Sequence, residues 1–265
     1  MKDLCALLFE LSNEDRLSIL MEIQRKPQKM THLAKRFKWT VQETSRNLTR
    51  LETALLTVKD RNGDFRLSPY GDAALTLLRG YEFVSRNRDY FSSHTLSKLP
   101  QEWKDGLGAL STCSRSDDVM MLFHNAENMI RNAKKYIWIL TDQVLASTIP
   151  LLSEAVGRGI EFRLILPRNP TVPDSVVEMC SKDPTLTRAG QKGLAQSKFI
   201  ESVDAVISVS EREVGILSFP TIDGKLDYRG FYSANDAPRS WCTSLFSRYW
   251  TGSSTEVPAS LRGPL

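Results

Sequence analysis

The sequence lacks the apolar segments and the cysteine spacing that would assign it to a membrane-protein or zinc-protein class. No apolar run approaches the roughly 20 residues that a helix needs to cross a bilayer, and MKDLCALLFELSNEDR has no secretory-signal pattern, so the cytoplasm is the expected compartment. Its four cysteines, Cys5, Cys113, Cys180 and Cys242, form no CxxC pair. We therefore expect reduced, mostly buried thiols, with no metal and no cofactor.

Motifs of common enzyme classes are also missing. The chain has no P-loop, no GxGxxG at a strand-to-helix turn, no HExxH and no GxSxG in a credible nucleophile elbow. Its three histidines, His32, His94 and His124, lie in different segments. Acid–base chemistry would have to rest on carboxylates or lysines, so we expect that the protein is not an enzyme.

The basic charge is concentrated in one segment. The chain has 265 residues, of which 41% are hydrophobic and 25% charged, and its net charge is only +4. Residues 29–66 contain nine basic and four acidic residues, a net of +5, so the remainder is close to neutral. A local basic excess on an otherwise neutral chain is typical of a nucleic-acid contact.

Three helices and a hairpin are predicted in this N-terminal part. Ser12 and Thr31 are candidate caps of the first two helices, and Thr40 with Glu43 has the spacing of a capping box for the third. LLTVKD and DFRLS follow as short strands around an Asn-Gly turn. This is the element order of a winged helix-turn-helix. A long helix from Pro69 to about Phe91 follows and is expected to carry an apolar stripe for its own domain or a second copy.

The third helix has an apolar face for the core and a polar face that we predict reads DNA. Gln pairs with adenine and Arg with guanine through two hydrogen bonds to the base edge. The base-reading candidates are Gln42, Arg46, Thr49 and Arg50. The phosphate-contact candidates are Lys35, Arg36, Lys38, Lys59 and Arg61. The alternatives are an ordinary solvated helix face and a winged helix that binds protein.

The pattern of apolar and polar residues changes from about residue 92. A connector is expected over 92–110, an α/β domain over 111–251 and a flexible tail over 252–265, after a winged-helix domain over 1–91. Short apolar runs such as YIWILTD and EFRLILP alternate with amphipathic segments, which predicts βαβ units and a mixed, largely parallel sheet. LTRAGQ is expected to be a strand, and APRSWCTSLFSRYW a closing helix.

Several of these segments together carry a family resemblance. SNEDRLSILMEIQRKPQKMTHLAKRFKWTVQETSRNLTRLETALLTVKDRNGDFRLSPYG resembles the N-terminal domain of archaeal winged-helix transcriptional regulators. Together with YFSSHTLSKLPQEW, KKYIWILTDQ and RGIEFRLILPRN it is similar to the family that includes methanogenesis regulatory proteins. The resemblance implies a DNA-binding head, a sensor-like α/β domain and a homodimer, and it matches Gln42, Arg46 and Arg50 to the recognition helix by position.

The α/β domain also resembles, faintly, the phospholipase D half-fold. That chemistry needs a histidine nucleophile near a lysine and an aspartate. In QSKFIESVD, Gln196 stands where the histidine would be, and Asp204 falls two residues late after Lys198. A catalytically degenerate relative is therefore expected, and a DNA-acting enzyme remains a third alternative.

For a sensor, ligands are expected beyond the carboxyl ends of parallel strands. Two arginines there would hold a small anionic group and aromatic side chains would form an apolar wall. The candidate effector residues are Trp138, Thr141, Asp142, Gln143, Arg168, Asn169, Arg229, Tyr232 and Trp241. A redox signal through Cys113 or Cys180 is the other possibility.

Overall fold

The computed structural model describes residues 1–256, and the chain divides into two compact units, Met1–Arg79 and a second that begins at Gly80. The sequence predicted the boundary at residue 91, whereas in the structure it falls between Arg79 and Gly80, inside a helix. Phe83 and Tyr90, in the predicted first domain, are buried in the core of the second unit. In residues 1–256 no helix is long and apolar enough to cross a membrane.

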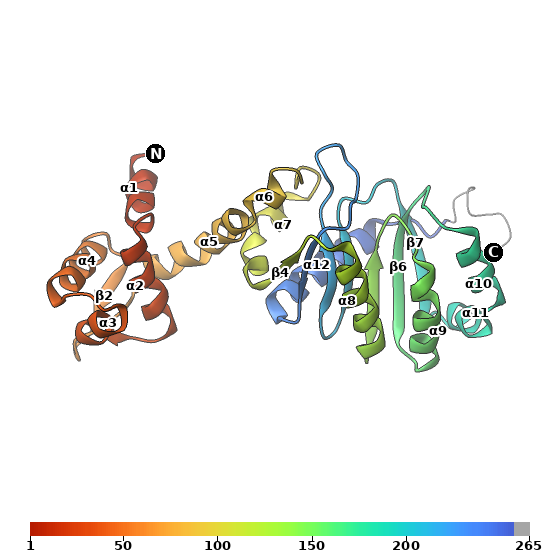
Figure 1. The fold of residues 1–265 in the computed structure, drawn as a ribbon, viewed down its shortest axis with the longest axis horizontal. Helices are drawn as coiled ribbons and strands as arrows, with labels where there is room; N and C mark the ends of the chain where they lie inside the picture. The colour runs from red at the N-terminus through yellow and green to blue at the C-terminus, as the bar shows by residue number, and fades with distance from the viewer. Residues whose placement is uncertain (257–265) are drawn as a thin grey trace. The chain divides into compact units, whose positions relative to one another are not determined.

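The N-terminal unit packs helices against a small antiparallel sheet (Figure 1). Its elements are α1 (Lys2–Leu11), α2 (Glu14–Arg25), β1 (Gln28–Lys29), α3 (Met30–Phe37), α4 (Val41–Thr53), β2 (Thr57–Lys59), β3 (Asp64–Leu67) and the start of α5 (Pro69–Arg86). The strand order is β1-β3-β2. Ile19, Leu33, Leu48 and Leu51 meet in its core. Helix α1 was not predicted.

The helix starts follow the local hydrogen-bond chemistry. Thr40 and Glu43 form the predicted capping box at the start of α4. The cap of α2 is Asn13 rather than Ser12, and α3 begins at Met30 without a side-chain cap, so Thr31 does not cap it. Asn13 and Lys29 have the extended backbone of an N-cap, whereas Ser12 is helical and ends α1, and Thr31 lies inside α3.

The hairpin between β2 and β3 turns around Asp60. Its carboxylate accepts the N–H groups of Asn62 (2.8 Å) and Asp64 (2.9 Å). Gly63 takes a φ of 83°, a left-handed conformation that suits glycine. The Asn-Gly signal thus predicted the hairpin, although within this turn only the glycine has a positive φ.

The second unit is a sheet covered on both faces by helices (Figure 1). After the end of α5 its helical elements are α6 (Arg88–Phe91), α7 (Gln101–Asp105), η1 (Leu107–Thr112), α8 (Val119–Asn132), η2 (Ala146–Thr148), α9 (Ile149–Gly157), α10 (Asp174–Lys182), α11 (Pro184–Gln191) and α12 (Asp236–Gly252). Its strands are β4 (Ser114–Ser116), β5 (Tyr136–Leu140), β6 (Glu161–Pro167), β7 (Ala195–Ile200), β8 (Val206–Ser210), β9 (Val214–Ser218) and β10 (Gly230–Ser233).

The sheet is mixed, but it is not largely parallel. Its order is β4-β10-β9-β8-β5-β6-β7. Only β5–β6 and β6–β7 pair in parallel, whereas β5–β8, β8–β9, β9–β10 and β10–β4 pair antiparallel. The prediction of a largely parallel sheet was wrong because the later strands follow one another through short turns without crossover helices.

Two further predictions about this unit were wrong. The segment predicted as a strand, LTRAGQ, belongs to helix α11, because the Asp183 carboxylate accepts the N–H groups of Thr185 and Leu186 and Pro184 starts the helix. The segment 92–110 is not a free connector, since Leu99, Trp103 and Leu107 are buried in the core.

The predicted tail, 252–265, is partly described. Ser254 exchanges two backbone hydrogen bonds with Phe199 of β7, at 2.8 and 2.9 Å. Residues 257–265 lie outside the described residues.

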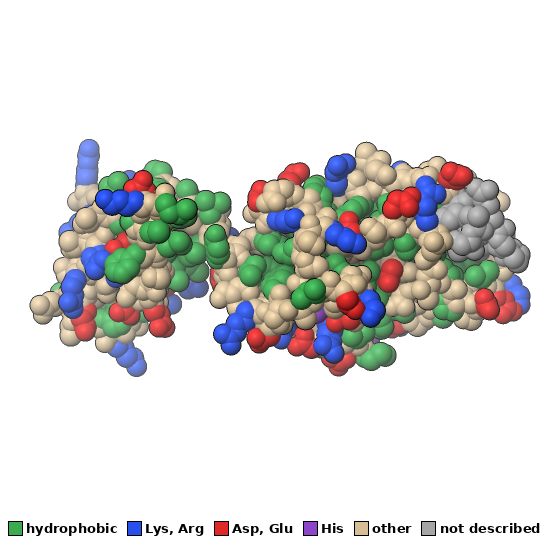
Figure 2. Space-filling view, turned by 90° about the horizontal axis from the view of Figure 1, so that it is seen from above, with side chains coloured by type: hydrophobic (Ala, Val, Ile, Leu, Met, Phe, Trp, Pro, Cys, Tyr) green, Lys and Arg blue, Asp and Glu red, His purple; other side chains and the backbone are tan. Residues whose placement is uncertain are grey.

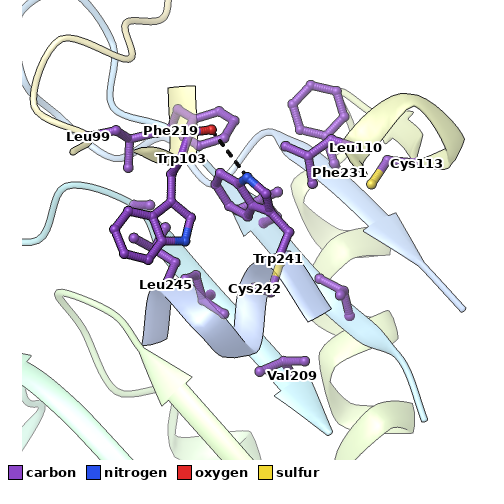
Figure 3. Packing of buried hydrophobic residues seen from close by; sticks show 14 of the residues in the cluster. Leu99, Trp103, Leu110, Cys113, Val209, Phe219, Phe231, Trp241, Cys242 and Leu245 are labelled. Atoms are coloured by element: carbon purple, nitrogen blue, oxygen red, sulfur yellow. Dashed lines mark hydrogen bonds between the residues drawn. The ribbon is translucent and has the colours of Figure 1, made fainter. Parts of the chain in front are cut away.

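One face of the sheet packs on α12 through an aromatic core. Trp241 of α12 is buried there, and its indole N–H donates to the Trp103 carbonyl at 3.2 Å (Figure 3). Phe219, just after β9, packs its ring against Trp241, and Phe231 of β10 belongs to the same buried cluster. The opposite face packs on α8, α9 and α11 through separate apolar clusters. The two faces therefore have different partners, and the second contains the cavity described below.

Candidate functional site

The polar face of α4 is solvent-exposed along its length. Gln42, Arg46, Thr49 and Arg50 are all exposed, while Leu48 and Leu51 point into the core. Among the described residues, Arg46 makes no side-chain hydrogen bond and no ion pair. Gln42 and Arg46 can therefore approach a groove without first losing a hydrogen bond or an ion pair.

Arg50 differs from Arg46 because it is held by α1. Its guanidinium donates to Glu10 at 2.7 Å and lies 5.4 Å from the Phe9 ring centroid. Glu10 also pairs with the buried Arg16 at 2.8 Å. The Glu10 hydrogen bond and charge raise the pKa of Arg50. The sequence did not predict this contact, because it did not predict α1 and because Glu10 and Arg50 are 40 positions apart in the chain.

The predicted phosphate contacts are also exposed. Arg36 pairs with Glu22 at 2.9 Å, and the Lys59 ammonium lies 5.5 Å from the Phe65 ring centroid. The predicted set Lys35, Arg36, Lys38, Lys59 and Arg61 is exposed throughout. Figure 2 shows Lys and Arg side chains projecting from several places on the visible face of the N-terminal unit, at the left, with acidic and hydrophobic side chains between them.

The carboxylate of Glu43, in the first turn of α4, takes part in the capping box of this helix. The Thr40 backbone N–H and hydroxyl both donate to Glu43, at 2.9 and 2.8 Å. These two bonds, in that order, and the charge of Arg46 lower the pKa of Glu43. The carboxylate therefore stabilises the first turn of α4, where the helix dipole also favours a negative charge.

The structure does not bring the predicted effector residues to one place. Thr141 and Gln143 line a cavity between the sheet and the helices, whereas Trp138 stacks on Phe246 of α12 and Trp241 lies in the same opposite core. Arg168 pairs with Glu201 at 2.6 Å.

The other predicted effector residues also lie apart from the cavity lining. Arg229 is near Asp227 at 3.8 Å, and Tyr232 packs on the cluster around α8. Asn169 is exposed in the loop after β6. Asp142 is not among the lining residues, but it accepts a hydrogen bond from the hydroxyl of Tyr228, which is one of them.

The cavity has a volume of about 420 Å³ and lies within the second unit. One wall is the sheet face that carries Ile139 of β5 and Leu164 of β6, which are partners in register. The other wall comes from α8, α9, α10 and α11, with side chains such as Phe123 and Leu152. Ile139 and Leu164 are only half-buried although they lie in the middle of the sheet, because the helices do not close over them.

The cavity has polar groups but no charged ones. Among the described residues that line it, none is Asp, Glu, Lys, Arg or His. Thr141 and Tyr228 share a hydrogen bond of 2.8 Å at its wall. Burial raises the pKa of Tyr228, so its hydroxyl stays protonated and donates to Asp142. Ser208 of β8 is 4% exposed, and its hydroxyl has no hydrogen-bond partner among the described residues.

The remaining candidate reactive groups are engaged or shielded. Burial raises the pKa of Cys113 to about 12 and also raises that of Cys180, which disfavours the thiolate that a redox sensor needs. His94 stacks on Tyr90 and contacts Asp227 at 3.1 Å. Lys198 donates to the Trp250 carbonyl at 3.0 Å.

No family model matches the sequence, and no curated protein matches it. Among solved structures, the chain is similar to TrmBL2, described as an archaeal chromatin protein with a novel mode of DNA binding. The two are 12% identical, the alignment covers 91% of this chain and 92% of the other, and the TM-score is 0.42.

Proposed function

We propose that the protein is a sequence-specific DNA-binding transcriptional regulator with a winged-helix head and a sensor-like α/β domain. The observation that carries the proposal is the exposed polar face of α4, where Gln42 and Arg46 stand free of packed contacts beside a basic hairpin. A helix of this composition fits the major groove, and lysines and arginines around it fit the phosphates.

The charge distribution supports the same proposal. The basic excess of the chain lies between residues 29 and 66, which form α3, α4 and the hairpin. Phosphate contacts by this segment give affinity that falls as salt rises, without sequence preference. Base contacts from Gln42 and Arg46 would add the preference.

The second unit would act as the sensor. A ligand that binds one conformation better shifts the population of two heads in a homodimer and so changes their fit to two half-sites. The cavity next to Thr141 and Gln143 supports a ligand role. No catalytic step is proposed: in the faint resemblance to the phospholipase D half-fold, Gln196 stands where the histidine would be, and Lys198 donates to the Trp250 carbonyl.

Selection from a randomised DNA pool tests the proposal. We expect enrichment of a palindrome, with affinity for it reduced about 5- to 160-fold by Arg46→Ala, because a two-point contact to a base is worth about 1–3 kcal/mol. Arg131→Ala, an exposed arginine on α8, is the matched control and should leave affinity unchanged. Unchanged binding of the Arg46→Ala variant would end the assignment of α4 as the reading helix.

Lys59→Ala separates affinity from sequence choice. This change in the hairpin should weaken all sequences about equally and reduce the slope of log affinity against log salt by about 1. The second candidate function is a winged helix that binds protein in the transcription machinery. It predicts that neither Arg46→Ala nor Lys59→Ala changes affinity for DNA. Its support is the exposed apolar side chains of α1, Leu4, Leu8 and Phe9.

A further inference from the structure

We propose that the cavity in the second unit binds a neutral, mainly hydrocarbon small molecule that carries a hydroxyl or carbonyl group. The inference deepens the sensor role proposed above by assigning the chemistry of the ligand. It also replaces the anionic effector that the sequence suggested, because Arg168 and Arg229 do not line the cavity.

The first argument is packing. Protein cores rarely leave voids larger than a water molecule, and a void of about 420 Å³ is in the size range of small-molecule sites. It lies over the two parallel strand pairs, where Ile139 and Leu164 remain half-buried under four helices. An apolar occupant would complete the burial of these two side chains.

The second argument is charge. None of the described lining residues is ionisable, apart from the thiol of Cys180 and the phenol of Tyr228. Burial raises the pKa of both groups, which keeps them neutral. A carboxylate or phosphate placed here would lose its water without gaining a cation. The site therefore selects against anions.

The third argument is the hydrogen-bonding group that the lining leaves without a partner. The Ser208 hydroxyl lies within the core, lines the cavity and has no partner among the described residues. A buried hydroxyl without a partner is costly, and a ligand hydroxyl or carbonyl would satisfy it. This explains why the ligand should carry one polar group rather than be a pure hydrocarbon.

Binding is tested on the full chain without DNA, after extraction of copurified lipid. The neutral dye N-phenyl-1-naphthylamine reports occupancy by fluorescence, and 1-decanol, n-decane and decanoate at pH 8 compete with it. We expect 1-decanol to displace the dye at least about 10-fold better than decanoate. Equal or better displacement by decanoate, or no binding of dye and decanol, would overturn the proposal.

Variants locate the site. Ser208→Ala should weaken 1-decanol about 5-fold, the effect of one hydrogen bond, and leave n-decane unchanged. Ser218→Ala is the matched control, because this buried serine of β9 is not among the lining residues. Ala195→Phe on β7 should fill the cavity and reduce dye binding, with thermal unfolding confirming that the variant folds. Dye and decanol binding unchanged in both Ser208→Ala and Ala195→Phe would overturn the assignment.

A separate measurement tests the sensor role itself. DNA affinity of the unmodified chain is compared with and without saturating 1-decanol. A change supports the role, whereas unchanged affinity with proven decanol binding removes the sensor role and leaves the ligand assignment standing.

Discussion

Tyr90 shows how one hydroxyl supports the core of the second unit. The Phe219 backbone N–H donates to the Tyr90 hydroxyl at 2.9 Å, and that hydroxyl lies 3.2 Å from the Arg229 carbonyl. Burial raises the pKa of Tyr90, so the phenol stays protonated and can donate while it accepts. The strand end at Phe219 depends on this side chain, because a buried N–H needs a partner.

Tyr90→Phe should therefore destabilise the protein by about 1–3 kcal/mol, since the Phe219 N–H loses its acceptor inside the core. Tyr136→Phe is the matched control, because no hydrogen bond to the Tyr136 hydroxyl occurs among the described residues, and its effect should be close to zero. Urea unfolding measures both. Equal stability losses in the two variants would contradict the role given to the Tyr90 hydroxyl.

Sequence reasoning at this scale depends on spacing along one element. Helical periodicity alone placed Gln42 and Arg46 on the side of α4 away from its core, and both are exposed. It did not predict that Glu10 holds Arg50, which requires a contact between distant helices. It also did not predict Ser208 or Leu164 at the cavity, because a void depends on how helices sit on the sheet.

At the scale of elements, the start of α4 depends on its capping box. Thr40→Ala should cost about 1 kcal/mol, because the Glu43 N–H loses its acceptor and the carboxylate loses a donor. Thr31→Ala is the control: Thr31 was predicted to cap α3 and makes no side-chain hydrogen bond among the described residues. Urea unfolding at pH 7 should show a loss only for Thr40→Ala.

The stabilisation that the capping box gives should depend on pH, and the pKa of Glu43 sets the direction of that dependence. The folded-state pKa of Glu43 is lowered, so its contribution is complete above the ordinary glutamate value of about 4.3 and is lost as pH falls through the folded value. The stability difference between Thr40→Ala and the unmodified chain should therefore narrow below about pH 4. A difference that widens on acidification would contradict the ionised capping box.

Helix α5 approaches the backbone of Leu56, the residue before β2, so closely that only glycine fits at Gly71. A Cβ there would lie 2.0 Å from the Leu56 carbonyl oxygen, a backbone atom that cannot move aside cheaply. Gly71→Ala should cost at least about 3 kcal/mol. Gly80→Ala in the same helix meets its nearest atom at an ordinary 3.6 Å and should stabilise the protein by about 0.5–1 kcal/mol. Thermal unfolding measures the Tm of both variants. Similar shifts in Tm for Gly71→Ala and Gly80→Ala would contradict the close approach.

Element type was predictable where a segment carried its own pattern. The Thr40 box, the Asn-Gly hairpin and the apolar strands β5 and β6 all occur as expected. The order of strands was not predictable, since the antiparallel pairing of β8 with β5 joins segments about 70 residues apart. Helix α11 was misassigned although Asp183-Pro184 carried a helix-start signal.

At the scale of the whole molecule, each unit has its own apolar core, and helix α5 runs from one to the other. Its exposed apolar residues Leu77, Tyr81 and Val84 are spaced so that they share one side of the helix. Leu77 and Tyr81 are 73% and 72% exposed, which is unusual for large apolar side chains in a row. The homodimer expected for reading two half-sites would cover this stripe.

Tyr81→Glu should therefore weaken self-association about 100-fold or more, because the twofold seam would bury a charge on each copy without a partner. Thr76→Glu is the control on the same helix, exposed and outside the stripe. Sedimentation measures the oligomer, and a two-half-site duplex should lose affinity in step with dimer loss while a single half-site is bound as before. A monomeric unmodified chain, or a Tyr81→Glu variant that remains dimeric, would exclude α5 as the seam and leave each head to bind DNA alone.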